Sequence, residues 1–241
     1  MNYEERLAEH CVIDIKDITA MSEEQFAMAR RNGIGASDSS AVLGTMDKFR
    51  TADDVLLNKL EKTYTEEERA IGDKPNVKKG KDLEPLNLLK AEGKLGVDII
   101  KSPHMYRLKG FDYLTINFDG LAIIENQLVP IEAKFVSTYA DKFYNFEELD
   151  KPALPPPNLN NTLAENIEYY AKYHGIPGYY MVQLQHQLMG TGAEYGYLAV
   201  IRDKTWDHYL FRIPRYGWIQ NGISTMCYTF WNKVERARRA K

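Results

Sequence analysis

The clearest hydrophobic pattern of this chain lies near its middle. Val129 and residues 131–135 form an apolar segment with two charged side chains at alternate positions, which predicts a buried β-strand. Because successive side chains of a strand point to opposite faces, Glu132 and Lys134 are expected on one face. Apolar, β-rich sequence precedes this segment. We therefore expect a β-sheet region over residues 97–135.

Capping residues and leucine spacing predict helices on either side of this region. Ser22 with Gln25 and Thr51 with Asp54 are capping boxes, each of which marks the start of a helix. Alternating apolar positions late in the chain predict a β-hairpin. The expected elements are helices that end near residues 31, 43 and 60, helices over 76–92, 163–173, 178–189 and 216–239, and hairpin strands 195–201 and 206–213.

Proline and glycine set the expected breaks. Pro85 lies within the predicted helix 76–92, where it either kinks the helix or marks its first turn, and Gly93 is the expected stop. Residues 140–160 contain Pro152 and three consecutive prolines. We expect an inserted loop there, without regular structure, that lies over a groove.

The composition is that of an ordinary globular domain. The 241 residues are 44% hydrophobic and 27% charged, so we expect one full core and a single domain, residues 1–241. No apolar run approaches membrane-spanning length and the N-terminus is charged, so we expect a cytoplasmic protein without membrane contact. Cys11 and Cys227 lack the spacing of a zinc or iron–sulfur motif and are expected to be reduced packing residues.

The formal net charge of −3 limits how this chain can contact nucleic acid. A protein that coats nucleic acid with its whole surface is excluded, and any contact must be local. Charge clusters are commonly solvated helix faces, so only a position near a metal site would indicate that a cluster contacts nucleic acid. The two basic clusters are Lys74, Lys78, Lys79 and Lys81, and Lys233, Arg236, Arg238, Arg239 and Lys241.

Two carboxylates and a lysine indicate a metal site in the β-rich region. Asp119 follows residues 113–118 and precedes Gly120, so a hairpin between the two segments would place Asp119 beside Glu132 and Lys134. Oxygen ligands suit Mg²⁺, and a lysine beside them can position a water. The alternative is an Asp-Gly turn with a solvated Glu-x-Lys face. The apolar surroundings favour the metal site, since buried charges need a metal or a partner.

Glu84 is the next candidate ligand. It lies on the apolar side of a predicted helix, where a carboxylate needs a partner to offset its desolvation. The nearest expected partner is the metal held by Asp119 and Glu132. The alternative is a salt bridge to Lys81 at helical spacing.

Residues 33–40 open a short helix directly after Arg30 and Arg31. Backbone N–H groups, the Ser37 hydroxyl and an arginine at a helix start can together bind a phosphate. The motif is not a dinucleotide fingerprint, because Asp38 stands where the third glycine should be. The alternative is a well-capped helix without a ligand.

Gln183 and Gln187 are expected on one face of a helix, one turn apart. Leu184 and Leu188 form another stripe, so we expect this helix to pack its back on the core and to offer amides to water or phosphate. A plain amphipathic helix would show the same pattern. His186 has no second histidine at ligand spacing and is expected to be a surface or packing residue.

Five blocks in this order resemble the YqaJ-like viral recombinases, relatives of phage lambda exonuclease within the PD-(D/E)xK nuclease superfamily. The blocks span about residues 30–201, and residues 135–175 match none of them. The superfamily's leading Pro-Asp is Phe118-Asp119 here, which leaves Asp119 itself unaffected. The blocks are Arg-Arg-x-Gly-Ile-Gly-Ala-Ser-Asp, Gly-x-x-x-Glu-Pro, Phe-Asp-Gly, Ile-Glu-Ala-Lys, and Ile-Pro-x-Tyr-Tyr-x-x-Gln-x-Gln-His-Gln-Leu.

The resemblance implies an α/β fold with a restriction-endonuclease-like core, a central mixed β-sheet flanked by helices. It also implies a homo-oligomer, a trimeric ring around duplex DNA, whose basic inner surface would reconcile an acidic chain with its substrate. The implied roles are metal binding (Mg²⁺ or Mn²⁺) by Glu84, Asp119, Glu132 and the Ala133 carbonyl, water activation by Lys134, a catalytic contribution from Gln183, and 5′-phosphate binding by Ser37 with Arg30 or Arg31.

The sequence therefore predicts a Mg²⁺-dependent deoxyribonuclease, an exonuclease acting on double-stranded DNA from 5′ ends in phage-type recombination with a single-strand annealing protein. One alternative is a structure-specific or restriction-type endonuclease on the same fold. Another is a non-catalytic DNA-end-binding protein, against which Asp119, Glu132 and Lys134 together argue. Two cysteines are too few for an iron–sulfur nuclease. Polarity, processivity and oligomeric state are left open.

Overall fold

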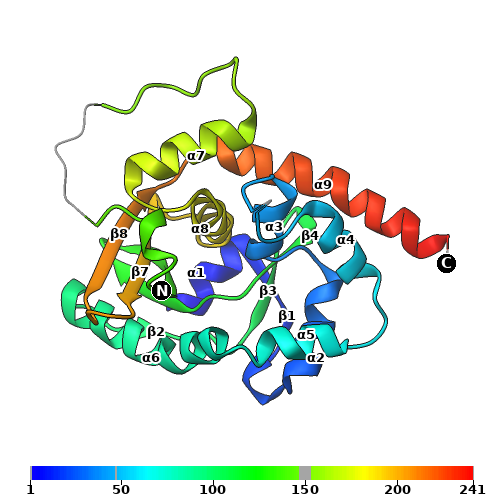
Figure 1. The fold of residues 1–241 in the computed structure, drawn as a ribbon, viewed down its shortest axis with the longest axis horizontal. Helices are drawn as coiled ribbons and strands as arrows, with labels where there is room; N and C mark the ends of the chain where they lie inside the picture. The colour runs from blue at the N-terminus through cyan, green and yellow to red at the C-terminus, as the bar shows by residue number, and fades with distance from the viewer. Residues whose placement is uncertain (1, 47, 147–152, 241) are drawn as a thin grey trace.

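Two β-sheets lie at the centre of the molecule, with helices around them (Figure 1). The computed structural model describes residues 2–46, 48–146 and 153–240. The predicted β-rich centre and the late hairpin are both present within them. The strands are β1 (Cys11–Ile15), β2 (Ile99–Ile100), β3 (Met105–Leu108), β4 (Phe111–Ile116), β5 (Gly120–Ile124), β6 (Gln127–Val136), β7 (Tyr195–Arg202) and β8 (His208–Pro214).

Most helices begin where the sequence supplies a capping residue. Ser22 and Thr51 cap α2 and α4 as predicted, and Thr65 caps α5, which the pattern analysis did not predict. No described helix is long and apolar enough to cross a membrane. The helices are α1 (Tyr3–His10), α2 (Glu23–Ala29), α3 (Ala36–Val42), α4 (Ala52–Leu60), α5 (Glu66–Gly72), α6 (Pro75–Leu95), α7 (Leu163–His174), α8 (Gly178–Thr191) and α9 (Gly217–Arg239), with 3-10 turns η1 (Ile18–Ala20), η2 (Arg30–Asn32) and η3 (Asp141–Phe143).

The larger sheet has the strand order β2-β5-β6-β7-β8. Strands β6 and β7 are parallel, with Glu132 opposite Leu198, and the other neighbours are antiparallel. A parallel pair needs a long crossover, and here the crossover contains α7 and α8. The smaller sheet, β1-β3-β4, is antiparallel. The mixed sheet flanked by helices confirms the predicted fold class.

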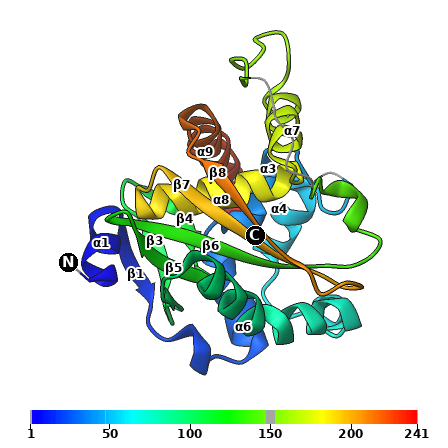
Figure 2. The same ribbon diagram turned by 90° about the vertical axis from the view of Figure 1, so that its left-hand side faces the viewer.

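Helix α8 is buried in the middle of the molecule. It lies on one side of β6 and β7, and α6 lies on the other (Figure 2). The side chains of Gln183, Gln185 and Gln187 are all at most 6% exposed, so the expectation that this helix offers its amides to water is wrong. His186 is 0% exposed and contacts the Ser39 hydroxyl at 2.7 Å, so it is a packing residue and not a surface one.

Helix α6 is longer than predicted at both ends. It continues through Gly93 to Leu95 and is capped by Gly96, whose φ of +66° belongs to the left-handed region that glycine favours at a helix end. The predicted stop at Gly93 is therefore wrong. Pro75 occupies the first turn, so Pro85 lies in the helix interior and does not mark its start.

Gly120 is the first residue of β5 and does not form a turn, which corrects the Asp-Gly expectation. A Cβ on Gly120 would come within 2.6 Å of Ile99 Cγ2 and 2.9 Å of Leu88 Cδ2, so the glycine permits close packing there. The turn between β5 and β6 instead uses Glu125 and Asn126, with φ of 49° and 60°. Strand β5, and not the preceding run of residues 113–118, is thus the hairpin partner of β6.

The expected Pro-rich loop is described in part. Residues 153–160 contain no helix or strand, as predicted, and the Pro155 carbonyl accepts a hydrogen bond of 2.6 Å from the Tyr170 hydroxyl. Pro152 lies outside the described residues. The two cysteines, Cys11 and Cys227, are buried and unpaired, as predicted.

A buried ion cluster joins α3 to α4. Asp38 is 1% exposed, and its carboxylate lies 2.6 Å from Lys59 Nζ and 2.7 Å from Arg50 Nη1. Although burial raises it, the positive charges of Lys59, Arg50 and Arg30 hold the pKa of Asp38 well below its usual range. The cluster fixes the short helix α3 against its neighbours.

Asp38→Ala is expected to lower the free energy of unfolding by roughly 3–5 kcal/mol, because Lys59 would be left buried without its partner. Urea denaturation at neutral pH measures the change. Asp53→Ala is the matched control: the Asp53 side chain is 81% exposed in its pair with Lys233, so a loss of about 1 kcal/mol or less is expected. Equal losses in the two variants would contradict a structural role for the cluster.

Candidate active site

Strand β6 places Glu132 and Lys134 on one face, as the alternation predicts. Lys134 Nζ lies 2.5 Å from Glu132 Oε1. The same ammonium is 4.0 Å from Asp119 Oδ2, so one cation faces two carboxylates. The three side chains that the sequence proposed as the centre of the site are therefore together in the fold.

Asp119 is held in place by the pairing of β5 with β6. It is the residue before β5, and its Oδ2 accepts a hydrogen bond of 3.0 Å from the Ala133 N–H on β6. Gly120 lies opposite Ile131 in this antiparallel pair. The backbone thus fixes the carboxylate across from the Glu132 and Lys134 positions.

Glu132 is held from the other side by α8. It is 6% exposed, and its Oε2 accepts a hydrogen bond from Gln187 Nε2. The other amide atom, Gln187 Oε1, is buried and has no hydrogen-bond partner among the described residues. Sequence analysis placed Gln187 on one face with Gln183 but gave it no role. The spacing of these two glutamines, one helical turn apart, was the feature of the sequence that could have indicated one.

The electrostatics of this centre favour a bound cation. Burial, and then the negative charge of Glu132, raise the pKa of Asp119 to about 7, with a smaller contribution from Glu84. Although burial lowers it, the two carboxylates raise the pKa of Lys134 above its usual value, so Lys134 stays protonated. A single ammonium does not fully offset the buried acids. Oxygen donors with excess negative charge suit a divalent cation such as Mg²⁺.

Glu84 lies near this centre but pairs elsewhere. Its carboxylate forms an ion pair with Lys101, and Lys81 pairs with Glu23, so the alternative of a Lys81–Glu84 salt bridge is wrong. Glu84 lines a small cavity together with Ala133 and Lys134. Within residues 2–46, 48–146 and 153–240, no three His, Cys, Asp or Glu side chains are arranged to hold a metal ion. Metal binding by Glu84 would therefore require it to leave Lys101.

Two further residues of the site were not predicted from the sequence. Asn87 on α6 donates hydrogen bonds to the carbonyls of Lys134, at 3.1 Å, and Ala199, at 3.0 Å, which ties the helix to both parallel strands. The Tyr180 ring centroid on α8 lies 5.5 Å from Lys134 Nζ, close enough for a cation–π interaction. Tyr180 lies within the last of the five sequence blocks but was given no role, and Asn87 had no sequence signal, because each acts through a contact distant in the chain.

Gln183 lies one turn before Gln187 on α8. It is 6% exposed, and its side chain makes no hydrogen bond within the part of the chain that the structure describes. The amide is therefore available to another group. The structure brings Gln183 to the helix that contacts the carboxylates without showing it bound to them.

The predicted phosphate cradle lies at the start of α3. Arg30 Nη2 donates a hydrogen bond of 2.8 Å to the Ser37 hydroxyl, so these two residues are adjacent as expected. Further along α3, the Ser40 hydroxyl donates to the Tyr179 carbonyl at 2.8 Å. Since Tyr179 precedes Tyr180, α8 connects the cradle to the carboxylate centre.

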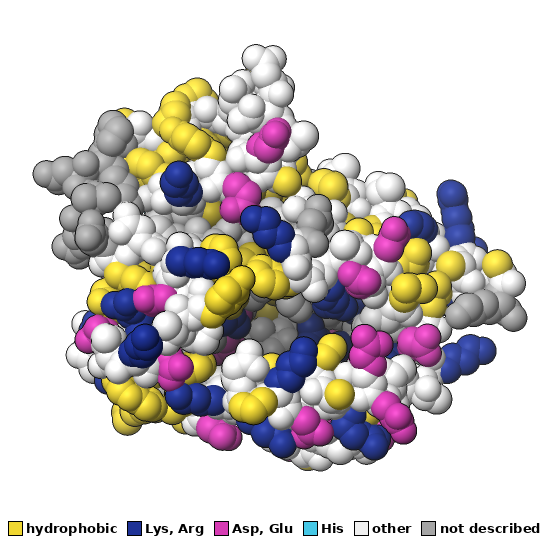
Figure 3. Space-filling model, viewed as in Figure 1, with side chains coloured by type: hydrophobic (Ala, Val, Ile, Leu, Met, Phe, Trp, Pro, Cys, Tyr) yellow, Lys and Arg dark blue, Asp and Glu magenta, His cyan; other side chains and the backbone are white. Residues whose placement is uncertain are grey.

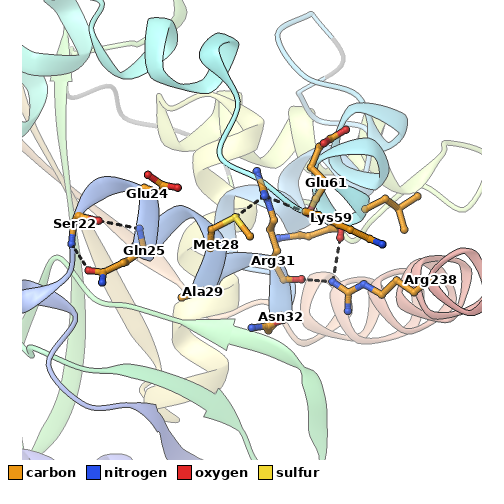
Figure 4. A pocket seen from close by; sticks show the side chains of 12 residues that line it. Ser22, Glu24, Gln25, Met28, Ala29, Arg31, Asn32, Lys59, Glu61 and Arg238 are labelled. Atoms are coloured by element: carbon orange, nitrogen blue, oxygen red, sulfur yellow. Dashed lines mark hydrogen bonds between the residues drawn. The ribbon is translucent and has the colours of Figure 1, made fainter. Parts of the chain in front are cut away.

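Arg31 lines a separate pocket, to which neither Arg30 nor Ser37 contributes (Figure 4). It is 2% exposed, and its guanidinium binds both carboxylate oxygens of Glu68, at 2.8 and 2.7 Å. It also donates to the Thr63 carbonyl at 2.9 Å, while Arg238 donates to the Arg31 carbonyl at 2.7 Å. Arg31 thus holds α5 and α9 in place, and Arg30 is the arginine adjacent to Ser37.

The face of the molecule shown in Figure 3 is hollowed near its centre, and Lys and Arg side chains lie around the hollow. Part of the first basic cluster is neutralised within the fold: Lys78 pairs with Asp73, and Lys79 with Asp203. The C-terminal cluster is likewise partly paired, since Lys233 contacts Asp53. Local basic surface is therefore limited, as the acidic net charge predicts.

Comparison with known proteins identifies similar sequences. A family model described as the YqaJ-like viral recombinase domain matches residues 25–194, which include every candidate site residue named above from Arg30 to Gln187. The uncharacterized protein YqaJ of Bacillus subtilis (strain 168) is 26% identical over 183 residues, covering 75% of this chain and 47% of that protein. The chain thus spans about half the length of this curated relative.

Solved structures of exonucleases share the fold. The alkaline exonuclease LHK-Exo from Laribacter hongkongensis superposes with a TM-score of 0.61 at 16% identity, covering 88% of this chain and 92% of that one. A phage related exonuclease from Haemophilus somnus 129PT gives a TM-score of 0.52 at 10% identity, covering 85% and 94%. The likeness confirms the expected restriction-endonuclease-like architecture.

Asp119→Asn is expected to stabilise the protein in EDTA at pH 8, on the order of 2 kcal/mol, and to change it little at pH 4. Because the pKa of Asp119 rises from 3.8 to about 7 on folding, its protonated form stabilises the fold at low pH, and this contribution is lost as the pH rises between those values. Urea denaturation at both pH values measures the effect. Saturating Mg²⁺ should remove the gain in unfolding free energy of the variant over wild type. An equal gain at pH 4 and pH 8 would contradict this expectation.

Proposed function

The chain belongs to the YqaJ-like viral recombinase domain family, and on this basis we propose that it is a metal-dependent exonuclease that hydrolyses double-stranded DNA from 5′ ends. The observation that carries the proposal is that Asp119, Glu132 and Lys134 converge while α8 connects them to the Arg30–Ser37 pair. A centre for hydrolysis and a binding site for an end phosphate would then share one rigid support. LHK-Exo, which has the same fold, has been crystallised with dAMP.

Asp119, Glu132 and the Ala133 carbonyl would hold Mg²⁺ or Mn²⁺, with Glu84 as a further ligand after release from Lys101. Burial, and then the charge of Glu132, raise the pKa of Asp119, so a cation there would offset an unfavourable charge interaction. A bound divalent cation supplies charge stabilisation to the phosphate oxygens during hydrolysis.

The remaining roles follow from the contacts of the chain's own residues. Lys134 is protonated, so it cannot act as a base, but its charge favours the hydroxide form of a neighbouring water and attracts the phosphate. Gln187 fixes the orientation of Glu132 through its hydrogen bond. The Gln183 amide, which has no hydrogen bond among the described residues, would donate to the substrate.

At the cradle, Arg30 and the Ser37 hydroxyl would bind the 5′ phosphate. A guanidinium and a hydroxyl already 2.8 Å apart can both donate to one phosphate group, and charge-assisted bonds of this kind are strong. Arg31 would act only by supporting the fold, because its Nη2 is bound by Glu68 and its Nη1 by the carbonyls of Glu61 and Thr63. We further propose that the protein works in phage-type recombination with a single-strand annealing protein, as a homo-oligomer that encloses the duplex.

Lys134→Ala is expected to lower kcat by about 10²–10³-fold, because it removes a fixed charge beside the reacting phosphate. Its Mg²⁺ affinity should be retained or increased, since a competing cation is gone. Glu132→Gln should lose both cleavage and Mg²⁺ binding. Nucleotide release from linear duplex DNA measures cleavage, and calorimetry measures Mg²⁺ binding.

Lys79→Ala is the matched control for Lys134. Its ammonium lies 4.8 Å from the Phe135 ring centroid and pairs with Asp203, so it is a neighbouring lysine outside the carboxylate centre. Activity close to that of wild type is expected for this variant. Near wild-type cleavage by Glu132→Gln would overturn the assignment of the site.

Arg30→Ala is expected to reduce the preference for 5′-phosphorylated over 5′-hydroxyl duplex by at least about tenfold, since a charge-assisted bond contributes roughly 1.5–3 kcal/mol. Ser37→Ala should reduce it less. Arg31→Ala should instead lower the free energy of unfolding and leave the preference of the folded protein intact. Initial rates on matched linear duplexes with Mg²⁺, and with EDTA as a blank, provide the measurement.

The same assay distinguishes the exonuclease from its alternatives. Cleavage of closed circular DNA, with equal wild-type rates on the two 5′ ends, would indicate an endonuclease on this fold. Binding of DNA ends without any metal-dependent cleavage would indicate an end-binding protein.

A further inference from the structure

A second pocket, with a volume of about 750 Å³, lies where the loop after α3 faces the turn between α7 and α8. The segment after η3 completes its wall. None of the residues that line it belongs to the proposed metal site or to the phosphate cradle. The pocket is therefore a separate feature of the surface.

Aromatic side chains on this pocket are unusually exposed. Phe49 is 60% exposed and Tyr169 is 52% exposed, although both are large and largely apolar. The Phe49 ring packs edge-on against Tyr179, with centroids 5.9 Å apart and an interplanar angle of 78°. Flat ring surfaces are thus presented at the pocket.

The charge of the pocket is positive. Lys48, Lys142 and Lys172 line it, and none of them forms an ion pair within the described part of the chain. Of the described lining residues, Glu168 alone is acidic, and its carboxylate is directed at the start of α8. A Cβ on Gly178 would come within 2.2 Å of Glu168 Oε1. Lys142 lies over the rings of Tyr139 and Phe143, and Lys48 is near Glu168, but the three lysines together still give the pocket excess positive charge for an anionic ligand.

A chain of aromatic contacts connects the pocket to the carboxylate centre. From Phe49 the contacts pass to Tyr179 and then to Tyr180, whose centroid lies 4.4 Å from that of Tyr179. Tyr180 in turn faces Lys134 at 5.5 Å. Two consecutive tyrosines at the start of α8 thus connect the pocket to the proposed site of hydrolysis.

We propose that this pocket binds unpaired nucleotides of single-stranded DNA, with bases stacked on Phe49 and Tyr169 and phosphates held by the lysines. Exposed aromatic rings combined with a basic groove are the features by which proteins bind single strands without sequence preference. The proposal extends the proposed DNA nuclease function and rests on it for the identity of the ligand.

The test is binding of a fluorescent twelve-nucleotide oligothymidine, measured by anisotropy in EDTA so that cleavage cannot occur. Phe49→Ala combined with Tyr169→Ala should weaken binding at least about tenfold, because each stacked base contributes substantially to affinity. Tyr228→Ala is the matched control, since Tyr228 is 57% exposed, packs against one tyrosine, and lies outside the pocket. It should bind like wild type.

The lysines are tested by the salt dependence of the same binding. Lys142→Ala and Lys172→Ala should each reduce the slope of log affinity against log salt by about 0.7, the value for one phosphate contact of a single strand. Lys16→Ala, an exposed lysine outside the pocket, should leave the slope unchanged. An abasic oligomer of the same length should bind wild type more weakly than the oligothymidine does.

Equal affinity of the double variant and wild type for the oligothymidine would overturn the proposal. Equal affinity of wild type for the abasic oligomer and for the oligothymidine would also overturn it, since the pocket would then be a general anion site. Phe49→Trp, which keeps a ring, should retain binding and shows that the alanine result is not a folding defect. The two proposals can fail separately. If the double variant loses oligothymidine binding while the wild type fails to cleave duplex DNA with Mg²⁺, the pocket is supported and the nuclease function is refuted.

Discussion

Two closely spaced carboxylates, one buried and one half-buried, beside a single ammonium are the constraint on which the rest of this molecule depends. Asp119 and Glu132 repel each other in a place with little solvent, and Lys134 offsets only part of that charge. Each neighbouring element holds one member of the set: β5 positions Asp119, Gln187 on α8 binds Glu132, and α6 binds the backbone of Lys134. The fold thus maintains two carboxylates close together at a cost in electrostatic free energy.

Helix α8 explains how one element can serve several parts of the molecule. Its polar side chains are buried, yet they are directed at different partners: Gln187 at Glu132, Gln185 at the Pro214 carbonyl, and His186 at Ser39. Because burial lowers the pKa of His186 to about 4, this histidine stays neutral and can pack without a counter-ion. One buried helix thus fixes the relative positions of β6, the end of β8 and α3.

Local sequence signals were sufficient for the strand β6, for the helices capped by Ser22 and Thr51 and for the three charged residues at the centre, since alternation and capping act over a few residues. Contacts between distant segments were not predictable. Gly120 reads as a turn in the sequence, but the fold needs it because Ile99 and Leu88 pack against it. Likewise Arg30 and Arg31 are equivalent in sequence, and only the tertiary position of Glu68 separates their roles.

The parallel pairing of β6 with β7 has a consequence for the order in which the chain folds. Glu132 pairs with Leu198, so this contact closes only after the crossover through α7 and α8 has been synthesised and packed. Pairings between residues so distant in sequence form late, because loop closure is entropically costly. The β5–β6 hairpin, which carries Asp119, Glu132 and Lys134, is local in sequence and can form earlier, whereas its support from β7 and from Gln187 on α8 comes only after the crossover has been synthesised.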